Sequence, residues 1–239
     1  MTHNETAIKT DRLIIALDFP TIDEARSCVQ KTSQHCCFYK IGLELLFSGG
    51  QDFVKELLAD GHRVFIDAKL LDIGATVEKA TANIAQLGAD FLTLHVSDTK
   101  TMQAAIKGRG SSSLKLLGVT VLTNLETEEL VEQGISGKTP KELVLHRAKL
   151  AKEAGLDGVI ASAQEAADIR EVVGPDFLIV TPGIRPVGSD IGDQARVMTP
   201  KLAIEAGADF LVVGRPISRA DNPAEAADQI AQEIAAAIV

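Results

Sequence analysis

Three charged residues follow a short apolar run in the first third of the chain. Asp67, Lys69 and Asp72 come directly after the run 64–66. Successive side chains of a strand point to opposite faces, so Asp67 and Lys69 should share a face, with Cα atoms about 6.5–7 Å apart. Charges at the end of a buried strand are costly unless they are paired or used in chemistry. This stretch therefore predicts either a structural ion-pair cluster or a catalytic site.

The charges around Lys69 indicate which chemistry it would perform. Two neighbouring carboxylates favour the ammonium form of Lys69, whereas a lysine that forms a Schiff base needs a lowered pKa. We therefore expect Lys69 to donate a proton. A divalent metal held by Asp67 and Asp72 would be repelled by Lys69 and by Lys40, so we expect no metal and no cofactor. An ammonium placed to protonate a developing carbanion, beside a carboxylate that repels a substrate anion, suits a cofactor-free decarboxylation.

Eight short apolar runs occur along the chain, and none alternates strictly between apolar and polar residues. Such runs are typical of parallel strands that are buried on both faces. The predicted strands are 13–17, 37–41, 63–67, 91–96, 116–122, 158–161, 177–181 and 210–213.

Helical patterns separate these runs. Several begin with a proline in the first turn and end just before a glycine, as helix punctuation predicts. The predicted helices are 22–31, 51–59, 75–87, 100–106, 127–133, 141–154, 164–173, 201–206 and 223–237. Eight strand–helix units of about 30 residues each use up the chain, so we expect an α/β fold, a single (β/α)8 TIM barrel domain over residues 1–239. A doubly wound open sheet is the alternative, but no G-x-G-x-x-G pattern follows the first strand.

Two phrases nearly repeat, at 86–92 and 205–211, and 154–160 is a looser version of them. Each combines a helix end, a glycine turn and the start of a strand, so we attribute the similarity to shared loop chemistry. The repetition supports a repeated β/α unit.

Polar and small residues gather at the predicted carboxyl ends of the strands, where the active sites of such barrels lie. They are Asp18, Lys40, Asp67, Lys69, Asp72, Thr123, Pro182, Arg185, Gly214 and Arg215, with Gln194 in the long loop after the seventh strand. Singly, each has a plain explanation as an ion pair, a cap or a turn. Together on one rim, they predict a binding site.

The last two loops predict a phosphate site. Barrels often bind phosphate after strands seven and eight, where backbone N–H groups and a short helix point at the anion. Gly214 lets the backbone approach closely, and the Arg215 guanidinium matches phosphate oxygens. The loop 184–194 contains two glycines and is expected to act as a lid. We therefore expect a phosphorylated small molecule as ligand.

Composition excludes several classes of partner. The formal net charge of -9 argues against nucleic acid and anionic membranes, which both require basic surfaces. No apolar segment near residue 1 resembles a signal peptide, and no apolar run reaches about 18 residues, so we expect a cytoplasmic protein. Cys28, Cys36 and Cys37 lack a metal-ligand spacing and are interpreted as reduced structural thiols. His95 ends a predicted strand and is interpreted as a packing residue at the rim.

The ordered set of motifs resembles the orotidine 5'-phosphate decarboxylase family over nearly the whole chain. The matching segments are 16–18, 39–44, the motif Asp67-x-Lys69-x-x-Asp72, 119–123, 181–186, 193–194 and 214–216. The motif with the lysine is moderately specific by itself, whereas the ordered set is very specific. The resemblance implies decarboxylation of orotidine 5'-phosphate to UMP, in de novo pyrimidine biosynthesis.

The resemblance also implies a role for each residue. Lys69 would protonate C6 of the pyrimidine, within an array of Lys40, Asp67, Lys69 and an Asp72 from a second subunit. Asp67 would lie near the departing carboxylate. The expected substrate-binding residues are Asp18 and Lys40 at the ribose, Thr123 near the base, Thr76 of the second subunit, Pro182, and Arg185, Gln194, Gly214 and Arg215 around the phosphate. The implied assembly is an obligate homodimer with shared active sites.

One position departs from the family pattern. Gly74 replaces the proline that usually follows the Asp-Ile pair, and the magnesium-dependent 3-keto-L-gulonate 6-phosphate decarboxylases and hexulose-phosphate synthases often have glycine there. Those relatives generally lack the lysine of the second strand and the segment 181–185, which are present here. A sugar-phosphate enzyme of this type is one alternative, and a non-catalytic nucleotide-binding barrel is another.

Overall fold

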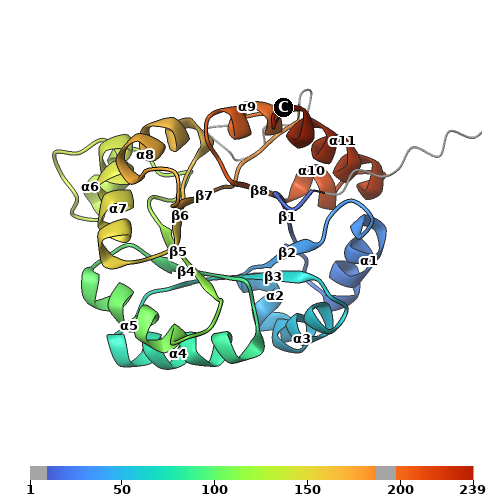
Figure 1. Cartoon of the computed structure of the whole chain (residues 1–239), viewed down its shortest axis with the longest axis horizontal. Coiled ribbons are helices and arrows are strands. Elements are labelled where there is room, and N and C mark those ends of the chain that lie inside the picture. Colours follow the sequence, from blue (N-terminus) through green and yellow to red (C-terminus); the bar gives the residue numbers. More distant parts are fainter. Residues whose placement is uncertain (1–9, 187–197, 239) are drawn as a thin grey trace, which may run out of the picture.

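The computed structural model describes residues 10–186 and 198–238, and its eight parallel strands close into a barrel (Figure 1). Each strand pairs with its neighbours in chain order, and β8 pairs with β1. The strands are β1 (Leu13–Ala16), β2 (Phe38–Ile41), β3 (Arg63–Leu70), β4 (Phe91–His95), β5 (Lys115–Val119), β6 (Gly158–Ile160), β7 (Leu178–Thr181) and β8 (Phe210–Val213). The predicted (β/α)8 barrel is confirmed.

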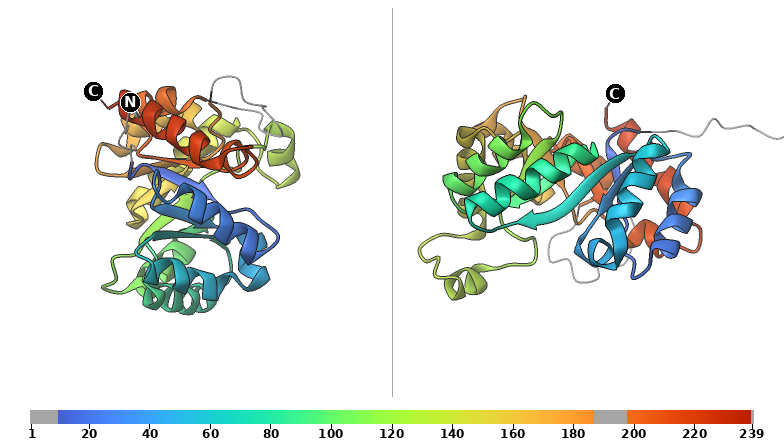
Figure 2. Two further views of the ribbon diagram at one scale, coloured as in Figure 1. Left: turned by 90° about the vertical axis from the view of Figure 1, so that its right-hand side faces the viewer. Right: turned by 90° about the horizontal axis from the view of Figure 1, so that it is seen from below.

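Helices form a ring outside the strands, and α6 projects from one end of the barrel (Figure 2). The helices are α1 (Ile22–Thr32), α2 (Leu43–Leu45), η1 (Leu46–Gly50), α3 (Gln51–Ala59), α4 (Gly74–Leu87), α5 (Thr99–Arg109), α6 (Thr127–Glu132), α7 (Pro140–Ala154), η2 (Ala163–Glu165), α8 (Ala166–Val173), α9 (Pro200–Glu205), α10 (Arg215–Ser218) and α11 (Pro223–Ala236). The predicted helices are present with shifts of a few residues at their ends. The short α2, η1 and α10 were not predicted. Within the two described ranges, no helix combines the length and apolarity that a membrane crossing would require.

Side chains cap the helices at the positions that the sequence indicated. A hydroxyl, carboxylate or amide oxygen of the residue before the helix accepts a backbone N–H of the first turn, which has no acceptor within the helix. The capping residues with this contact include Thr21, Asp98, Thr139, Thr199 and Asn222. These caps set where each helix begins, and hence how long each loop at the rim is.

Aromatic side chains fill the amino-terminal end of the barrel. Phe38, Phe91 and Phe210 are the first residues of β2, β4 and β8, and their ring centroids lie 4.9–6.0 Å apart in edge-on contacts. The Arg63 guanidinium lies 4.1 Å from the centroid of the Phe38 ring. Offset and edge-on rings, with a cation over one face, pack this end tightly. The carboxyl ends of the strands are therefore left to form the site.

The three near-repeats of the sequence build the same contact between strands. In each, an aspartate just before an even-numbered strand donates its N–H to the carbonyl of a residue on the preceding strand, and its carboxylate accepts the N–H of that residue. The pairs are Asp90 with Val64, Asp157 with Leu116 and Asp209 with Ile179. The similar sequences therefore reflect a shared structural role: in each repeat, the aspartate joins the starts of two neighbouring strands.

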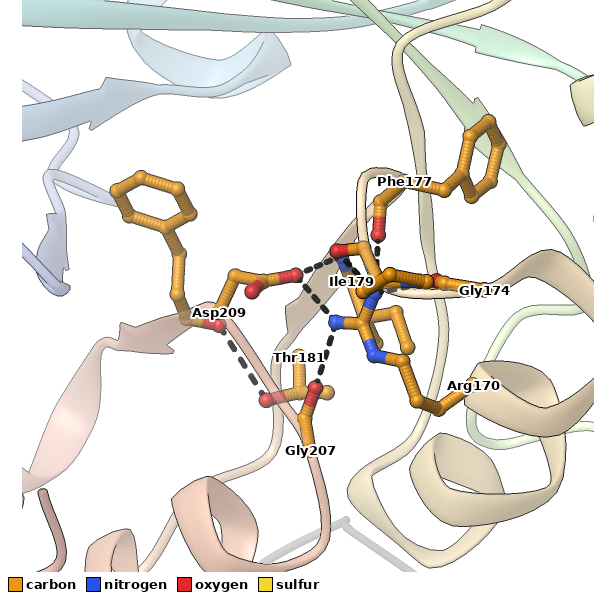
Figure 3. A network of polar contacts seen from close by, with 9 residues as sticks. Arg170, Gly174, Phe177, Ile179, Thr181, Gly207 and Asp209 are labelled. Carbon is orange, nitrogen blue, oxygen red and sulfur yellow. Dashed lines mark hydrogen bonds and ion pairs between the residues drawn. The ribbon is translucent and has the colours of Figure 1, made fainter.

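An arginine completes the third of these contacts. Arg170, on α8, donates to the Asp209 carboxylate at 2.7 Å and to the carbonyls of Gly174, Phe177 and Gly207 (Figure 3). The guanidinium thus satisfies carbonyl groups at a helix end and in two loops, which would otherwise lack partners. This cluster holds the base of β7 and β8, whose other ends carry the predicted phosphate loops.

Candidate functional site

Strand β3 bulges where it reaches the site. Residues 66–70 of β3 span only residues 92–94 of β4, so two residues of β3 have no counterpart on its neighbour. Lys69 lies in this bulge with φ of 47°, in the left-handed region. The predicted end of this strand at Asp67 was wrong, because the strand continues to Leu70 beyond the bulge. The side chains of Asp67 and Lys69 nevertheless meet, as the sequence predicted.

Four charged side chains form a row of alternating sign across three strands. Nζ of Lys40 lies 3.0 Å from Oδ1 of Asp18 and 3.4 Å from Oδ2 of Asp67. Nζ of Lys69 lies 2.8 Å from the same Oδ2 of Asp67. Lys40 and Asp67 are each only 8% exposed, and charges so deeply buried are stable only when they are paired.

The row keeps its central groups ionised. Burial opposes the charged form of Lys40, but the charges of Asp67 and Asp18 outweigh burial and raise the pKa of Lys40 above its ordinary value. Burial likewise opposes the carboxylate of Asp67, but the charges of Lys40 and Lys69 hold its pKa below the usual range. His95, at the end of β4, has its pKa lowered by burial and by Lys69, which favours the neutral imidazole.

Glycine at position 42 makes room for the first ion pair of the row. A Cβ placed on Gly42 would lie 3.0 Å from Oδ1 of Asp18 and 3.1 Å from Nζ of Lys40. Both distances are shorter than most contacts of a Cβ atom, so a side chain here would push the two charged groups away by a few tenths of an ångström. Gly42 was not among the predicted site residues.

Two adjoining hollows open at the carboxyl ends of the strands and share Lys40, Asp67, Lys69, Pro182 and Val212. The first, of about 200 Å³, is largely apolar, and its further lining residues are Phe65, Val119, Val121, Leu122, Thr123, Asn124 and Ile160. The second, of about 460 Å³, is polar, and its further lining residues are Ala16, Asp18, Glu44, Gly183, Arg185, Gly214, Arg215, Ser218 and Arg219. The shape therefore joins a compartment suited to a planar apolar ring to one suited to an anion.

Three arginines line the polar hollow, and none of them lines the apolar one. Arg185 follows β7, and Arg215 and Arg219 lie in and after the short α10 that follows β8. A Cβ placed on Gly214 would make only ordinary contacts with Ala16 and Asp18, so the protein's own packing leaves space beside this backbone. Clustered guanidinium groups beside accessible backbone are suited to phosphate oxygens.

The structure brings most of the predicted site residues together. Those that line the two hollows are Asp18, Lys40, Asp67, Lys69, Thr123, Pro182, Arg185, Gly214 and Arg215. Asp72 and Thr76 are exposed and line neither hollow, and Oδ1 of Asp72 accepts the N–H of Ile73 at 2.6 Å. Gln194 lies outside the described residues. The expected contribution of Asp72 and Thr76 to a neighbouring subunit stays a prediction.

Thr93 was not among the predicted site residues, and the structure places it in contact with the charged row. Thr93 is fully buried in β4, and its hydroxyl contacts both the Asp67 carboxylate and the backbone of Lys69. The only available signal was a single polar residue within an otherwise apolar run. Threonine is also a common strand former, so this signal has a plain explanation.

The cysteines and the possible metal ligands bear on two further predictions. In the part of the chain that the structure describes, Cys28, Cys36 and Cys37 form no disulfide bond. Their interpretation as reduced structural thiols stays a prediction. Within the same residues, no three His, Cys, Asp or Glu side chains are grouped as ligands of one metal ion would be. The expectation that the chain works without a metal stays a prediction.

Fold and site together define a (β/α)8-barrel protein with a charged, two-part hollow at the carboxyl ends of its strands. Residues 11–230 match the model of the family described as "Orotidine 5'-phosphate decarboxylase / HUMPS family", and the chain belongs to that family. The sequence resemblance is thereby confirmed.

Curated relatives are similar over almost their full length. The chain is 50% identical over 228 residues to an orotidine 5'-phosphate decarboxylase of Bradyrhizobium sp. (strain ORS 278), covering 95% of this chain and 93% of the relative. It is 50% identical over 236 residues to the orotidine 5'-phosphate decarboxylase of Methylobacterium nodulans, covering 98% of this chain and 99% of the relative.

Solved structures agree with this relationship. A crystal structure of orotidine 5'-phosphate decarboxylase from Lactobacillus acidophilus superimposes with a TM-score of 0.82 at 35% identity, covering 94% of this chain and 99% of the other. The crystal structure of an uncharacterized conserved protein from Geobacillus kaustophilus superimposes with a TM-score of 0.81 at 36% identity. The match covers 93% of this chain and 99% of the other.

Proposed function

We propose that this chain is a carboxy-lyase that decarboxylates orotidine 5'-phosphate to UMP in de novo pyrimidine biosynthesis, without a cofactor and in the cytoplasm. The observation that carries the proposal is the contact between Lys69 and Asp67, at 2.8 Å, in the wall shared by an apolar and a cationic hollow. The 50% identity to curated decarboxylases supports it.

The substrate would lie across the two hollows. The phosphate would bind to Arg185, Gly214 and Arg215, and Gln194 would join it from the loop after β7. The ribose hydroxyls would contact Asp18 and Lys40, which already form an ion pair at 3.0 Å. The pyrimidine would enter the apolar compartment, beside Thr123 and Pro182. This placement puts C6 and its carboxylate against the Asp67–Lys69 pair.

The reaction would use these two charges in sequence. The buried Asp67 carboxylate repels the substrate carboxylate in the bound state, and this repulsion is relieved as CO2 departs. The C6–CO2 bond breaks, and its electron pair stays on C6. The Lys69 ammonium donates a proton to C6, giving UMP, and the neutral lysine takes a proton from water. Lys40 keeps the row paired throughout, since it contacts Asp67 at 3.4 Å.

The test of this proposal is an assay of the purified chain after EDTA treatment and desalting. Loss of the ultraviolet absorbance of the orotate ring should proceed at an unchanged rate. Activity that disappears and returns with Mg²⁺ would instead favour a sugar-phosphate enzyme, the alternative that Gly74 raises. Tight UMP binding without turnover would indicate a non-catalytic nucleotide-binding barrel.

The active sites would be shared in a homodimer. Asp72 and Thr76 are exposed in one chain, together with the apolar Leu71 and Ile73, which are 59% and 74% exposed. Burial of this segment against a second copy would place Asp72 and Thr76 at the partner's site.

Asp72→Asn and Lys69→Ala chains should each be inactive alone. An equal mixture should regain roughly a quarter of wild-type activity, because half of the dimers are mixed and each mixed dimer has one intact site. Absence of any recovery after subunit exchange would contradict shared sites.

A further inference from the structure

The bulge in β3 removes a backbone N–H from the strand ladder. Between residues 66 and 70 the pairing with β4 is interrupted, and Lys69 lies in the left-handed conformation with φ of 47°. A buried N–H without an acceptor would cost about 1–3 kcal/mol. The hydroxyl oxygen of Thr93, on β4, accepts this N–H at 2.9 Å. A side chain therefore replaces the missing partner of the ladder.

The same hydroxyl reaches the Asp67 carboxylate, and its single proton determines how the contact runs. A threonine hydroxyl has one hydrogen to donate. Because Oγ1 accepts from the Lys69 N–H, its own hydrogen is directed to Oδ1 of Asp67, 2.8 Å away. The other oxygen, Oδ2, faces Nζ of Lys69 at 2.8 Å and Nζ of Lys40 at 3.4 Å. Each carboxylate oxygen thus has its own donors, and the plane of the group is fixed.

We propose that Thr93 is a positioning residue of this site, whose hydroxyl holds the Asp67 carboxylate and the bulged Lys69 backbone in one arrangement. The proposal deepens the proposed decarboxylase function and rests on it. Thr93 lines neither hollow and is 0% exposed, so it acts through Asp67 and Lys69 without touching the substrate. The left-handed backbone of Lys69 costs about 1–2 kcal/mol by itself, so it needs such support.

Loss of the hydroxyl should disturb chemistry more than binding. The carboxylate of Asp67 could then rotate, and the Lys69 ammonium would lose its fixed distance to the reacting carbon. Displacements of about 1 Å in a catalytic group reduce rates by about 10²-fold. Arg185 and Arg215, the proposed phosphate ligands, follow β7 and β8 and would be unaffected. The expected signature is a lower kcat with KM for orotidine 5'-phosphate and Kd for UMP nearly unchanged.

The experiment compares three variants of the full-length chain. Thr93→Val keeps the shape and removes the hydroxyl, and it should lower kcat at least about tenfold, as loss of a hydrogen bond to a charged group predicts. Thr93→Ser restores the hydroxyl and should recover most of kcat. The matched control is Thr32→Val, because Thr32 on α1 is equally buried and donates to the carbonyl of Cys28 at 2.9 Å. It should lower the melting temperature but not kcat.

Three results would overturn the proposal: a kcat of Thr93→Val within threefold of the wild type, a loss in Thr93→Ser as large as in Thr93→Val, or an equal loss of kcat in Thr32→Val. Circular dichroism and melting temperatures establish that each variant is folded. If Thr93→Val does not fold, Thr93→Ala replaces it, with kcat corrected for the folded fraction. A kcat of Thr93→Ala within threefold of Thr93→Ser would then overturn the proposal.

A measurement without substrate separates this proposal from the proposed function. The carboxyl ¹³C resonance of Asp67, assigned with Asp67→Asn, reports its titration directly. The titratable groups that face Asp67 are Lys40 on β2, Lys69 on β3 and His95 on β4. All three remain in Thr93→Val, so a higher pKa of Asp67 in that variant would isolate the hydroxyl, and an unchanged pKa would overturn the proposal. A wild-type chain that does not consume orotidine 5'-phosphate would instead refute the proposed function.

Discussion

Nζ of Lys69 lies 2.8 Å from Oδ2 of Asp67, and Lys69 holds this position from a left-handed backbone conformation. Among residues 10–186 and 198–238, Lys69 is the one residue other than glycine with a positive φ. Backbone strain of this kind concentrates at functional sites, where the surrounding structure must maintain it. The strain indicates that placement of the ammonium beside the carboxylate matters more than local regularity of the strand.

Replacement of Lys69 by alanine should abolish turnover. The change removes the proposed proton donor, and positioned acids contribute about 10²–10⁴-fold to rates, so kcat should fall at least about 10²-fold. The matched control is Lys55→Ala, because Nζ of Lys55 lies 2.8 Å from an Asp52 carboxylate on the exposed surface of α3. That variant should retain wild-type kcat. A Lys69→Ala enzyme with near-normal kcat would refute the role of Lys69 as proton donor.

Replacement of Arg215 by alanine should lower kcat/KM by at least about 10²-fold, since binding energy from a non-reacting phosphate can be used at the reacting carbon. The loss should appear in kcat as well as in KM. Orotidine, which lacks the phosphate, provides the control substrate. Its slow turnover should be unchanged by the substitution. A loss that affects KM alone, or affects orotidine equally, would contradict the assignment of Arg215 to the phosphate.

Acid unfolding should report the ionisation of Asp67. Burial alone would raise the pKa of Asp67, but Lys40, Lys69 and the Thr93 hydrogen bond lower it below its ordinary value. A carboxyl with a lowered pKa stabilises the fold above its unfolded-state pKa, and this contribution is lost as the pH falls through the folded-state value. Between about pH 5 and pH 2, Asp67→Asn should therefore lose less free energy of unfolding than the wild type. Urea titrations at each pH measure this difference.

The exposed Asp60 offers the control for that experiment. Asp60→Asn should lose as much free energy of unfolding as the wild type between about pH 5 and pH 2. If Asp67→Asn loses as much free energy of unfolding at acidic pH as the wild type, the native ion pairs of Asp67 do not contribute to stability.

Most of the charged row could be predicted from the sequence, because barrel topology brings all strand ends to one rim. Lys40, Asp67 and Lys69 each follow or end an apolar run, so their meeting required only the fold class. The helix starts were similarly accessible, since capping residues act within a few positions of themselves. These features depend on local sequence or on a general property of the architecture.

The features that escaped prediction depend on contacts between strands. The β3 bulge follows from its register with β4, and apolar spacing contains no information about that register. The tight fit of Gly42 against the ion pair of Asp18 and Lys40 arises only in the barrel, where these residues come together. The role of Thr93 could not be predicted for the same reason, because its hydrogen-bond partners lie on a different strand.

Position 74 offers a test of how the departure from the family pattern affects stability. Gly74 is the first residue of α4, and Ile73 before it has φ of -58° and ψ of 145°. Proline is favoured at a first helical position, because its missing N–H has no intrahelical acceptor, and the residue before a proline prefers such an extended conformation. A Cβ on Gly74 would approach only Ala104, at 3.4 Å. The native backbone is therefore compatible with proline.

Gly74→Pro should raise the free energy of unfolding by about 0.4–1 kcal/mol, because it reduces the conformational entropy of the unfolded chain. Gly74→Ala should give an increase of similar direction, while Gly49→Pro, at a residue with φ of 94°, should destabilise the chain and serves as the mismatched control. Urea unfolding at pH 7 measures all three. Decarboxylase activity in Gly74→Pro should stay within about twofold of the wild type, since proline fits the native backbone between Asp72 and Thr76 and leaves both residues in place. A destabilised Gly74→Pro chain would show that α4 begins in a different conformation.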